Sequence, residues 1–333
     1  MPKEYENSFH GVLGSTKLRY ANPLLFFKLK KIIQQKKITN LIIVHPYYGW
    51  LAWLLKKSTG VKLSMLSHNI EAVRFKSMGK PWWRLLWFYE KHTHQILDHN
   101  FFVTAEDLDF AVKNYELDKN KCFVITYGIE WQQPPTVAEK TAAAILLRKQ
   151  YNIEDDEKIL LFNGTLDYSP NIEAIDYIIN NINPLLLNNT DFKYKIIICG
   201  KGLPPVYNEL KSLKDKNMVY AGFVDDINVV FKGADIFLNP VITGGGIKTK
   251  LVEALGNGLS AVSCKSGAYG IPTEIVKDKL NIVDDFDWAS FVQQIFLINT
   301  NAITANSFFN HFYWGNIAKK AVEIISGNST TSK

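Results

Sequence analysis

Short, continuously apolar runs alternate with helix-like segments along most of the chain, and this alternation constrains the fold more than any other feature. A strand that helices cover on both faces is apolar throughout, whereas a half-exposed strand alternates between apolar and polar residues. The runs therefore predict parallel sheets packed between helices. In the first half the predicted strands are 41–45, 61–67, 100–104 and 122–126, and the predicted helices are 48–57, 81–96 and 105–115.

A second series of the same kind follows a segment with two prolines at 130–136, which we interpret as a linker before a helix at 138–150. Its predicted strands are 158–163, 194–199, 218–221, 236–238 and 259–263, and its predicted helices are 170–187, 204–213, 226–232 and 248–256. A length of 333 residues fits two domains. We therefore predict two doubly wound, Rossmann-like α/β domains with a cleft between them, and a disordered tail at 326–333.

The first forty residues depart from this pattern. A doubly wound domain usually opens with a strand, a glycine turn and a helix, and residues 1–20 contain no convincing strand. We expect the first domain to lack that opening unit, which leaves open whether Met1 is the true start. Residues 22–37 predict a basic amphipathic helix, which fits either a solvated surface or an anionic membrane face.

The composition narrows the class of protein. A net charge of +6 is compatible with an acidic ligand, such as a nucleotide diphosphate, or with an anionic membrane surface. The charged opening residues do not resemble a signal peptide, and no apolar stretch of about 18 residues could span a bilayer. Cys122, Cys199 and Cys264 lie too far apart for a disulfide framework or a metal site, and they favour a reducing, cytoplasmic compartment.

A run of three glycines, Gly244, Gly245 and Gly246, carries the strongest functional signal. It lies between a predicted strand and a helix that starts near Ile247, so main-chain N–H groups and the positive end of the helix dipole could hold a diphosphate. Lys248 and Lys250 would add positive charge in the first turn. Glu253 shares a face with Lys250 and would bind neutral hydroxyls, such as those of a ribose. The alternative is a tight loop beside a surface Lys–Glu pair.

Three further stretches are candidates for the same or a neighbouring site. The turn at Gly164 and Thr165 follows a strand and would face the same cleft. His68 also follows a strand directly and could contact a sugar or phosphate oxygen, with Asn69 and Glu71 beside it. The tryptophan-rich segment from Lys80 predicts a helix that packs in the core, lines an acceptor groove or meets a membrane interface.

Together these stretches resemble the family 4 glycosyltransferases of the GT-B fold. The resemblance covers roughly 42–325 and is strongest over 160–270. There GTLDYSPNIEA, ICGKG, GFVDD, ADIFLNP and GGGIKTKLVEALGNG appear in family order. SHNIEAVRF, FFVTAEDLDF and VITYGIE match in the first half, and FYWGNIAKKAVEII resembles the closing helix.

The resemblance implies a retaining transfer of a sugar from a nucleotide-diphosphate sugar to a glycan, lipid-linked or small-molecule acceptor, in surface polysaccharide biosynthesis. It implies no metal, no other cofactor and no nucleic acid. Residues 1–150 would form the acceptor-side domain, residues 151–305 the donor domain, and 306–325 a helix returning to the first domain.

The resemblance also implies roles for individual residues. His68, Lys250 and Glu253 would be catalytic; Gly244–Gly246 and Lys250 would hold the diphosphate and Glu253 the ribose. Gly164, Thr165, Gly200 and Ile247 would complete the donor site, and Asn69 and Glu71 would lie on the acceptor side.

The sequence departs from the family at Gly245, where a second glutamate is usual, and at Thr165 and Asn171, where cations are usual. Lys250 could compensate for the missing cations. Two alternatives stay open: a catalytically degenerate GT-B binding module and a nucleotide-sugar epimerase. A nicotinamide-dependent dehydrogenase is disfavoured because no G-x-G-x-x-G opens either domain.

Overall fold

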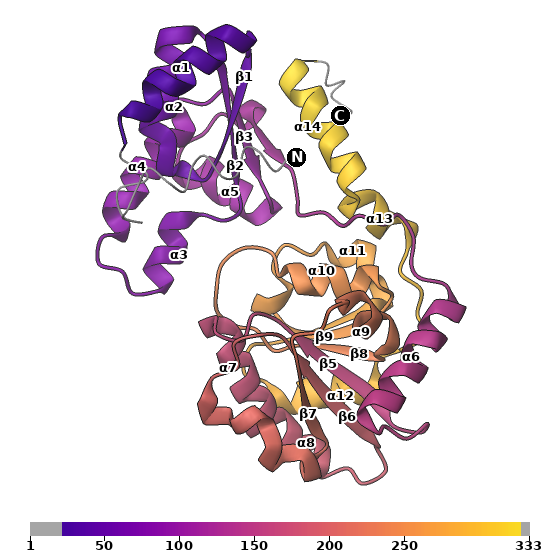
Figure 1. Ribbon diagram of the computed structural model, residues 1–333. Coiled ribbons are helices and arrows are strands. Elements are labelled where there is room, and N and C mark those ends of the chain that lie inside the picture. Colours follow the sequence, from indigo (N-terminus) through magenta and orange to yellow (C-terminus); the bar gives the residue numbers. More distant parts are fainter. Residues whose placement is uncertain (1–21, 328–333) are drawn as a thin grey trace. The chain divides into compact units, whose positions relative to one another are not determined.

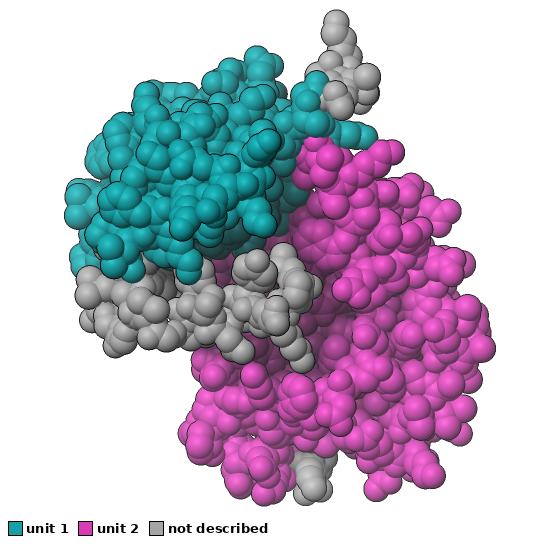
Figure 2. Space-filling view, turned by 45° about the horizontal axis from the view of Figure 1, so that its top comes forward, with its two compact units in different colours: residues 1–125, 323–333 teal, residues 126–322 magenta. Residues whose placement is uncertain are grey.

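The computed structural model describes residues 22–327, which form an α/β protein with two separate parallel sheets (Figure 1). The expectations for residues 1–20 and for 328–333 of the tail lie outside the described residues. The chain divides into two compact units, coloured separately in Figure 2. Unit 1 comprises residues 1–125 with 323–333, and unit 2 comprises 126–322.

Unit 1 contains a four-stranded parallel sheet in the order β1-β2-β3-β4. Its strands are β1 (Asn40–Val44), β2 (Lys62–Ser67), β3 (His99–Phe102) and β4 (Cys122–Val124). Its helices are α1 (Leu24–Lys36), α2 (Gly49–Thr59), α3 (Glu71–Ser77), α4 (Trp83–Gln95) and α5 (Ala105–Asn114). Separate apolar clusters, one around Leu63 and Met65 and another around Phe102, confirm the prediction of a parallel sheet between helices.

The short helix α3 was not expected from the sequence. It has only seven residues, which is too few for a periodic pattern. Its N-terminus is stabilised by a residue distant in sequence: the buried carboxylate of Glu90, on α4, accepts hydrogen bonds from the backbone N–H groups of Glu71 (2.9 Å) and Ala72 (2.8 Å). A cap supplied by another helix leaves no local sequence signal.

Unit 2 contains a six-stranded parallel sheet in the order β10-β9-β8-β5-β6-β7. Its strands are β5 (Lys158–Asn163), β6 (Tyr194–Cys199), β7 (Met218–Gly222), β8 (Ile236–Asn239), β9 (Ser260–Cys264) and β10 (Leu280–Val283). Two large apolar clusters lie on its two faces. The consecutive β5 residues Leu160 and Leu161 point to opposite faces and belong to different clusters. The doubly wound architecture predicted for this half is confirmed.

The helices of unit 2 follow the prediction with specific differences. They are α6 (Val137–Tyr151), α7 (Ser169–Tyr177), α8 (Asn183–Leu187), α9 (Ile227–Gly233), α10 (Thr249–Gly256), α11 (Thr273–Val276), α12 (Trp288–Leu297), α13 (Asn306–Phe312) and α14 (Trp314–Ser326), which ends beyond the unit. The predicted α-helix at 204–213 is wrong: Pro205–Lys216 forms 3₁₀ turns, interrupted where Asn208, Glu209 and Leu210 adopt left-handed conformations. Strand β10 and helix α12 were not predicted.

Helix α6 belongs to unit 2, because that unit begins at residue 126, whereas the predicted boundary at residue 150 assigns this helix to the first domain. It packs closely on α9 at Gly233, where a Cβ atom would lie 2.7 Å from the backbone of Ala143. Residues 306–325, predicted as one closing helix, form α13 and α14, which separate where Tyr313 pairs with Ile129. None of the described helices has the length and apolarity needed to cross a membrane.

Candidate functional site

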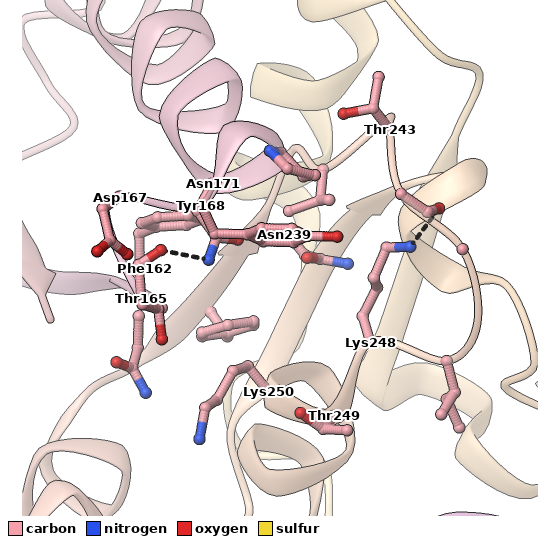
Figure 3. Close-up of a pocket in the computed structure, with 18 residues that line it drawn as sticks. Phe162, Thr165, Asp167, Tyr168, Asn171, Asn239, Thr243, Lys248, Thr249 and Lys250 are labelled. Carbon is pink, nitrogen blue, oxygen red and sulfur yellow. Dashed lines mark hydrogen bonds between the residues drawn. The ribbon is translucent and has the colours of Figure 1, made fainter. Parts of the chain in front are cut away.

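A cavity of about 630 Å³ lies at the carboxyl ends of β5 and β8 in unit 2 (Figure 3). Parallel sheets bind ligands at this edge, because the loops and helix N-termini that follow the strands meet there. Figure 3 shows Thr165 and Asn171 on one side of the cavity and Lys248 on the other. The lining residues are Phe162, Asn163, Gly164, Thr165, Asp167, Tyr168, Pro170, Asn171, Phe237, Asn239, Val241, Thr243, Gly244, Gly245, Ile247, Lys248, Thr249 and Lys250.

The segment Thr243–Lys248, which we call the glycine loop, forms one wall of this cavity. Gly244 and Gly246 have φ angles of +87° and +68°, a conformation that other residues rarely adopt. The loop is tied to α7 by the Thr243 hydroxyl, which donates a hydrogen bond to Glu173 (2.8 Å). Gly244 and Gly246 therefore allow the loop to adopt its conformation. The absence of side chains also leaves the main chain accessible to a ligand.

Lys248 holds the glycine loop from inside. Its ammonium group donates hydrogen bonds to the carbonyl oxygens of Gly244 (3.0 Å) and Gly246 (3.3 Å). Burial lowers the pKa of this lysine to about 8. Lys248 also occupies the N-cap position of α10, and among the described residues no side chain caps that helix. The first N–H groups of α10 are thus available to an anion in the cavity.

Lys250 and Glu253 lie on one face of α10, as predicted, and form an ion pair of 2.7 Å. Lys250 lines the cavity, whereas Glu253 does not and has only 16% of its side chain exposed. The second carboxylate oxygen of Glu253 accepts a hydrogen bond from the hydroxyl of Tyr127 (2.9 Å). Burial, reinforced by the neighbouring carboxylate, raises the pKa of Tyr127. Tyr127 was not singled out in the sequence, although its place in the VITYGIE segment is a signal that could have found it.

The opposite wall is the turn after β5. The side chain of Asn171 donates a hydrogen bond to the carbonyl oxygen of Thr165 (2.8 Å) and packs so closely on Gly164 that a Cβ atom there would lie 2.6 Å away. Gly200 does not line the cavity. With φ at +140° it packs on the Gly164 carbonyl, where a Cβ atom would approach to 1.8 Å, so Gly200 shapes the wall from behind.

In unit 1, polar side chains gather where β1 and β2 end. His45 follows β1, and its ring packs at 4.7 Å, edge to face, on the ring of His68, which follows β2 and is exposed. His45 has a φ of +64°, rare for a residue with a side chain, and such strain is found mainly at functional sites. Burial lowers the pKa of His45, which favours the neutral imidazole.

Glu71 is almost fully buried beneath this histidine pair. Its carboxylate pairs with Arg74 at 2.5 Å, lies 3.3 Å from His45 and accepts a hydrogen bond from the hydroxyl of Tyr47. A carboxylate held by these partners is suited to orienting them, whereas the exposed His68 can meet a ligand. His45, Tyr47 and Arg74 were not singled out in the sequence.

The structure therefore brings together Gly164, Thr165, Gly244, Gly245, Ile247 and Lys250 around one cavity, with Glu253 paired to Lys250. Gly200 and Gly246 lie outside its lining. His68, Asn69 and Glu71 belong to unit 1. Within residues 22–327 we find no group of three or more His, Cys, Asp or Glu side chains that could hold a metal ion.

Two family models match the chain. The model for glycosyl transferases group 1 matches residues 157–300, and the model for glycosyltransferase family 4 matches residues 3–133. Among curated proteins, chitobiosyldiphosphodolichol beta-mannosyltransferase of Debaryomyces hansenii is 21% identical over 277 residues, which cover 74% of this chain and 57% of that protein. The chain spans 31 to 57% of the length of the curated relatives considered.

Solved structures share the fold at low sequence identity. Sucrose-phosphate synthase of Thermosynechococcus elongatus superposes with a TM-score of 0.70 and 16% identity, over 93% of this chain and 79% of that one. HepE of Anabaena, solved in complex with UDP, superposes with a TM-score of 0.70 and 13% identity, over 94% of this chain and 84% of that one.

Proposed function

Since the chain belongs to the group 1, family 4 glycosyltransferases and has the GT-B fold that its sequence predicted, we propose that it transfers a sugar from a nucleotide-diphosphate sugar to an acceptor hydroxyl, with retention of anomeric configuration. The observation that carries the proposal is the cavity at the carboxyl edge of the unit 2 sheet. It combines a glycine loop, the N-terminus of α10 and Lys250 with a carboxylate one turn deeper at Glu253.

The donor diphosphate fits the glycine-loop wall. Its oxygens would accept hydrogen bonds from the first N–H groups of α10 and from Lys250, while Lys248 keeps the loop in shape. Glu253 would accept hydrogen bonds from the ribose hydroxyls, which requires its contacts with Lys250 and Tyr127 to rearrange or be shared. We propose that these groups balance the diphosphate charge without a metal ion.

In the proposed reaction the bond between the anomeric carbon and the diphosphate oxygen breaks, and a bond from the acceptor oxygen to the same carbon forms on the same face. The acceptor proton passes to the departing diphosphate. Lys250 and the α10 amides stabilise the charge that develops on the leaving group. His68, exposed at the carboxyl edge of unit 1, would contact the transferred sugar or the acceptor.

The acceptor we propose is a glycan, a lipid-linked saccharide or a small molecule, within surface polysaccharide biosynthesis. We also propose a cytoplasmic location. The three cysteines are free and buried, and burial raises their thiol pKa values, which suits a reducing compartment but also protects the thiols in any compartment.

Calorimetric titration with UDP, GDP and ADP tests the donor site, and UDP comes first because HepE was solved with UDP. We expect one of the three to bind, and Glu253→Ala to weaken that binding by about 1–3 kcal/mol through loss of hydroxyl hydrogen bonds. Absence of binding by all three would contradict the donor site, and unchanged affinity in Glu253→Ala would contradict the ribose role.

The transfer itself is tested with the matching radiolabelled nucleotide sugar. Incorporation of label into a glycan or lipid extract supports transfer, whereas conversion of the donor to an isomer without an acceptor would identify an epimerase.

A further inference from the structure

Large apolar side chains are exposed on the turn between α3 and α4 of unit 1 and on the first two turns of α4. Figure 1 shows where α3 and α4 lie in unit 1. The exposed fractions are 53% for Met78, 45% for Trp82, 75% for Leu85 and 69% for Phe88. Leu85 and Phe88 are one helical turn apart on α4, so they lie on the same face of that helix. Soluble surfaces carry single exposed apolar residues routinely, but a contiguous group of this size indicates a docking surface.

The exposed group continues into an apolar hollow of about 510 Å³ on α3, α4 and α5. Val73, Trp83, Trp87, Phe88 and Phe110 are among its lining residues. The hollow and the turn together form one surface, which we call the aromatic surface.

The segment 72–89, which carries most of the aromatic surface, is cationic. Residues 72–89 contain four cationic side chains, Arg74, Lys76, Lys80 and Arg84, and no carboxylate. Arg74 is paired with Glu71, but Lys76 and Arg84 lie over the ring of Trp83, at 5.0 and 5.5 Å from its centroid. Long cationic side chains that lie along aromatic rings can keep their charged ends at the level of water while the rings enter an apolar medium.

We propose that the aromatic surface docks on an anionic lipid bilayer. Trp82, Leu85 and Phe88 would enter the boundary between headgroups and acyl chains, and Lys76, Lys80 and Arg84 would bind the lipid phosphates. Charge complementarity selects this occupant: the cations of segment 72–89 match an anionic leaflet, and the exposed carboxylates Glu106 and Asp109 are confined to α5. Segment 72–89 has no carboxylate or amide side chain that could hydrogen-bond a glycan.

The basic helix α1 is the competing membrane surface within the same unit. It exposes Leu24 (68%) and Phe27 (67%) beside Lys28 and Lys31. It has no tryptophan, however, and tryptophan is the residue most enriched at membrane interfaces. Helix α1 has four lysines, so charge does not favour the aromatic surface over it. The aromatic surface combines tryptophan with an adjoining apolar hollow, and on that ground it is the stronger anchor.

The position of this surface also bears on the acceptor. Helix α3 begins at Glu71, shortly after His68, so a docked turn would hold the His45–His68 edge of unit 1 near the bilayer. An acceptor with a lipid tail could then reach that edge without leaving the membrane. This consequence rests on the proposed transfer reaction, whereas the docking itself does not.

Co-sedimentation with vesicles tests the docking. Full-length protein is mixed with vesicles of phosphatidylcholine alone or of phosphatidylcholine with phosphatidylglycerol, at low and high salt. We expect binding to the anionic vesicles, weakened by salt, and a loss of about tenfold or more in the double variant Leu85→Gln/Phe88→Gln and in Lys76→Gln/Lys80→Gln. The exposed pair Val137→Gln/Ile303→Gln, from unit 2, is the matched control and should bind like the wild type.

The variant Leu24→Gln/Phe27→Gln decides between the two surfaces. If it abolishes vesicle binding while Leu85→Gln/Phe88→Gln does not, α1 is the anchor and the proposal is overturned. Failure of wild-type protein to bind anionic vesicles overturns it too, as does an equal loss in the unit 2 control. Thermal melting shows that each variant is folded. Nucleotide affinity, measured without vesicles, reports on the donor site alone, so failure of the proposed function remains distinguishable from failure of docking.

Discussion

The hydroxyl of Tyr127 donates a hydrogen bond of 2.9 Å to the carboxylate of Glu253, across 126 positions of sequence. The other oxygen of the same carboxylate is paired with Lys250 at 2.7 Å. Glu253 is therefore oriented by two donors, one from its own helix and one from the segment that enters unit 2. A carboxylate oriented in this way loses less conformational entropy when it accepts hydrogen bonds from a ribose.

Replacing Tyr127 by Phe tests this orientation. The variant keeps the ring packing on Trp314 (5.9 Å between centroids) and removes only the hydroxyl, so the fold should persist. We expect nucleoside diphosphate binding to weaken by about 1 kcal/mol in calorimetry. Tyr151→Phe is the control, because its hydroxyl contacts Gln150 and does not line the cavity. Equal affinities for Tyr127→Phe and wild type would mean that Tyr127 is structural only.

Lys250 is expected to distinguish phosphate from nucleoside. Lys250 lines the cavity and would bind the diphosphate, so Lys250→Ala should weaken binding of the nucleoside diphosphate by about 1.5–3 kcal/mol, the range for hydrogen bonds to charged groups. The corresponding nucleoside should bind the variant almost as well as the wild type, and Lys250→Arg should recover part of the loss. A similar loss for the nucleoside and its diphosphate would place the effect on Glu253, whose partner is also removed.

Gly200 is expected to contribute to the stability of the fold, because it packs directly behind the turn at Gly164. Gly200→Ala would place a Cβ 1.8 Å from the Gly164 carbonyl oxygen, at a φ of +140°. We expect a loss of about 3 kcal/mol in the free energy of unfolding, from strain and overpacking together. Gly222→Ala has a φ of +69° and no atom within 4 Å of the added Cβ, so it measures backbone strain alone. Losses of the same size in both variants would contradict the packing role.

The sequence predicted the strands better than the helices, for physical reasons. Buried parallel strands are apolar throughout, so β5 and β6 were found with their exact bounds. Helix α3 is stabilised at its start by the distant Glu90, and the segment Pro205–Lys216 is irregular despite helix-like composition. Such elements depend on tertiary contacts that no local window contains.

The same limit applies to the candidate site. The glycine loop and the Lys250–Glu253 pair are local in sequence, and their proximity was predicted correctly. The contacts of Tyr127 with Glu253 and of Tyr47 with Glu71 join separate segments, and no spacing rule reveals them. The family resemblance predicts Glu71 on the acceptor side, and the structure buries its carboxylate among His45, Tyr47 and Arg74.

Glu90 should make the stability of unit 1 depend on pH. Burial raises its pKa to about 7, although it accepts hydrogen bonds from the N-terminus of α3 and from Tyr115. In the unfolded state the Glu90 carboxyl releases its proton near pH 4.5. In the folded state it keeps that proton up to about pH 7. It follows that the contribution of Glu90 to stability is complete below pH 4.5 and is lost as the pH rises through 7. The free energy of unfolding should fall by about 3 kcal/mol between pH 4.5 and pH 8.

The variant Glu90→Gln removes this titration while keeping an oxygen that can accept from α3. We expect the wild type to lose stability relative to the variant as the pH rises from 5 to 8. Denaturant unfolding, followed by tryptophan fluorescence, measures the free energy of unfolding of both proteins. Glu106→Gln, at an exposed site in the first turn of α5, is the control and should leave that pH dependence unchanged. Parallel pH profiles for wild type and Glu90→Gln would show that Glu90 stays ionised in the folded protein. Its carboxylate would then be stabilised by the α3 amides more strongly than burial destabilises it.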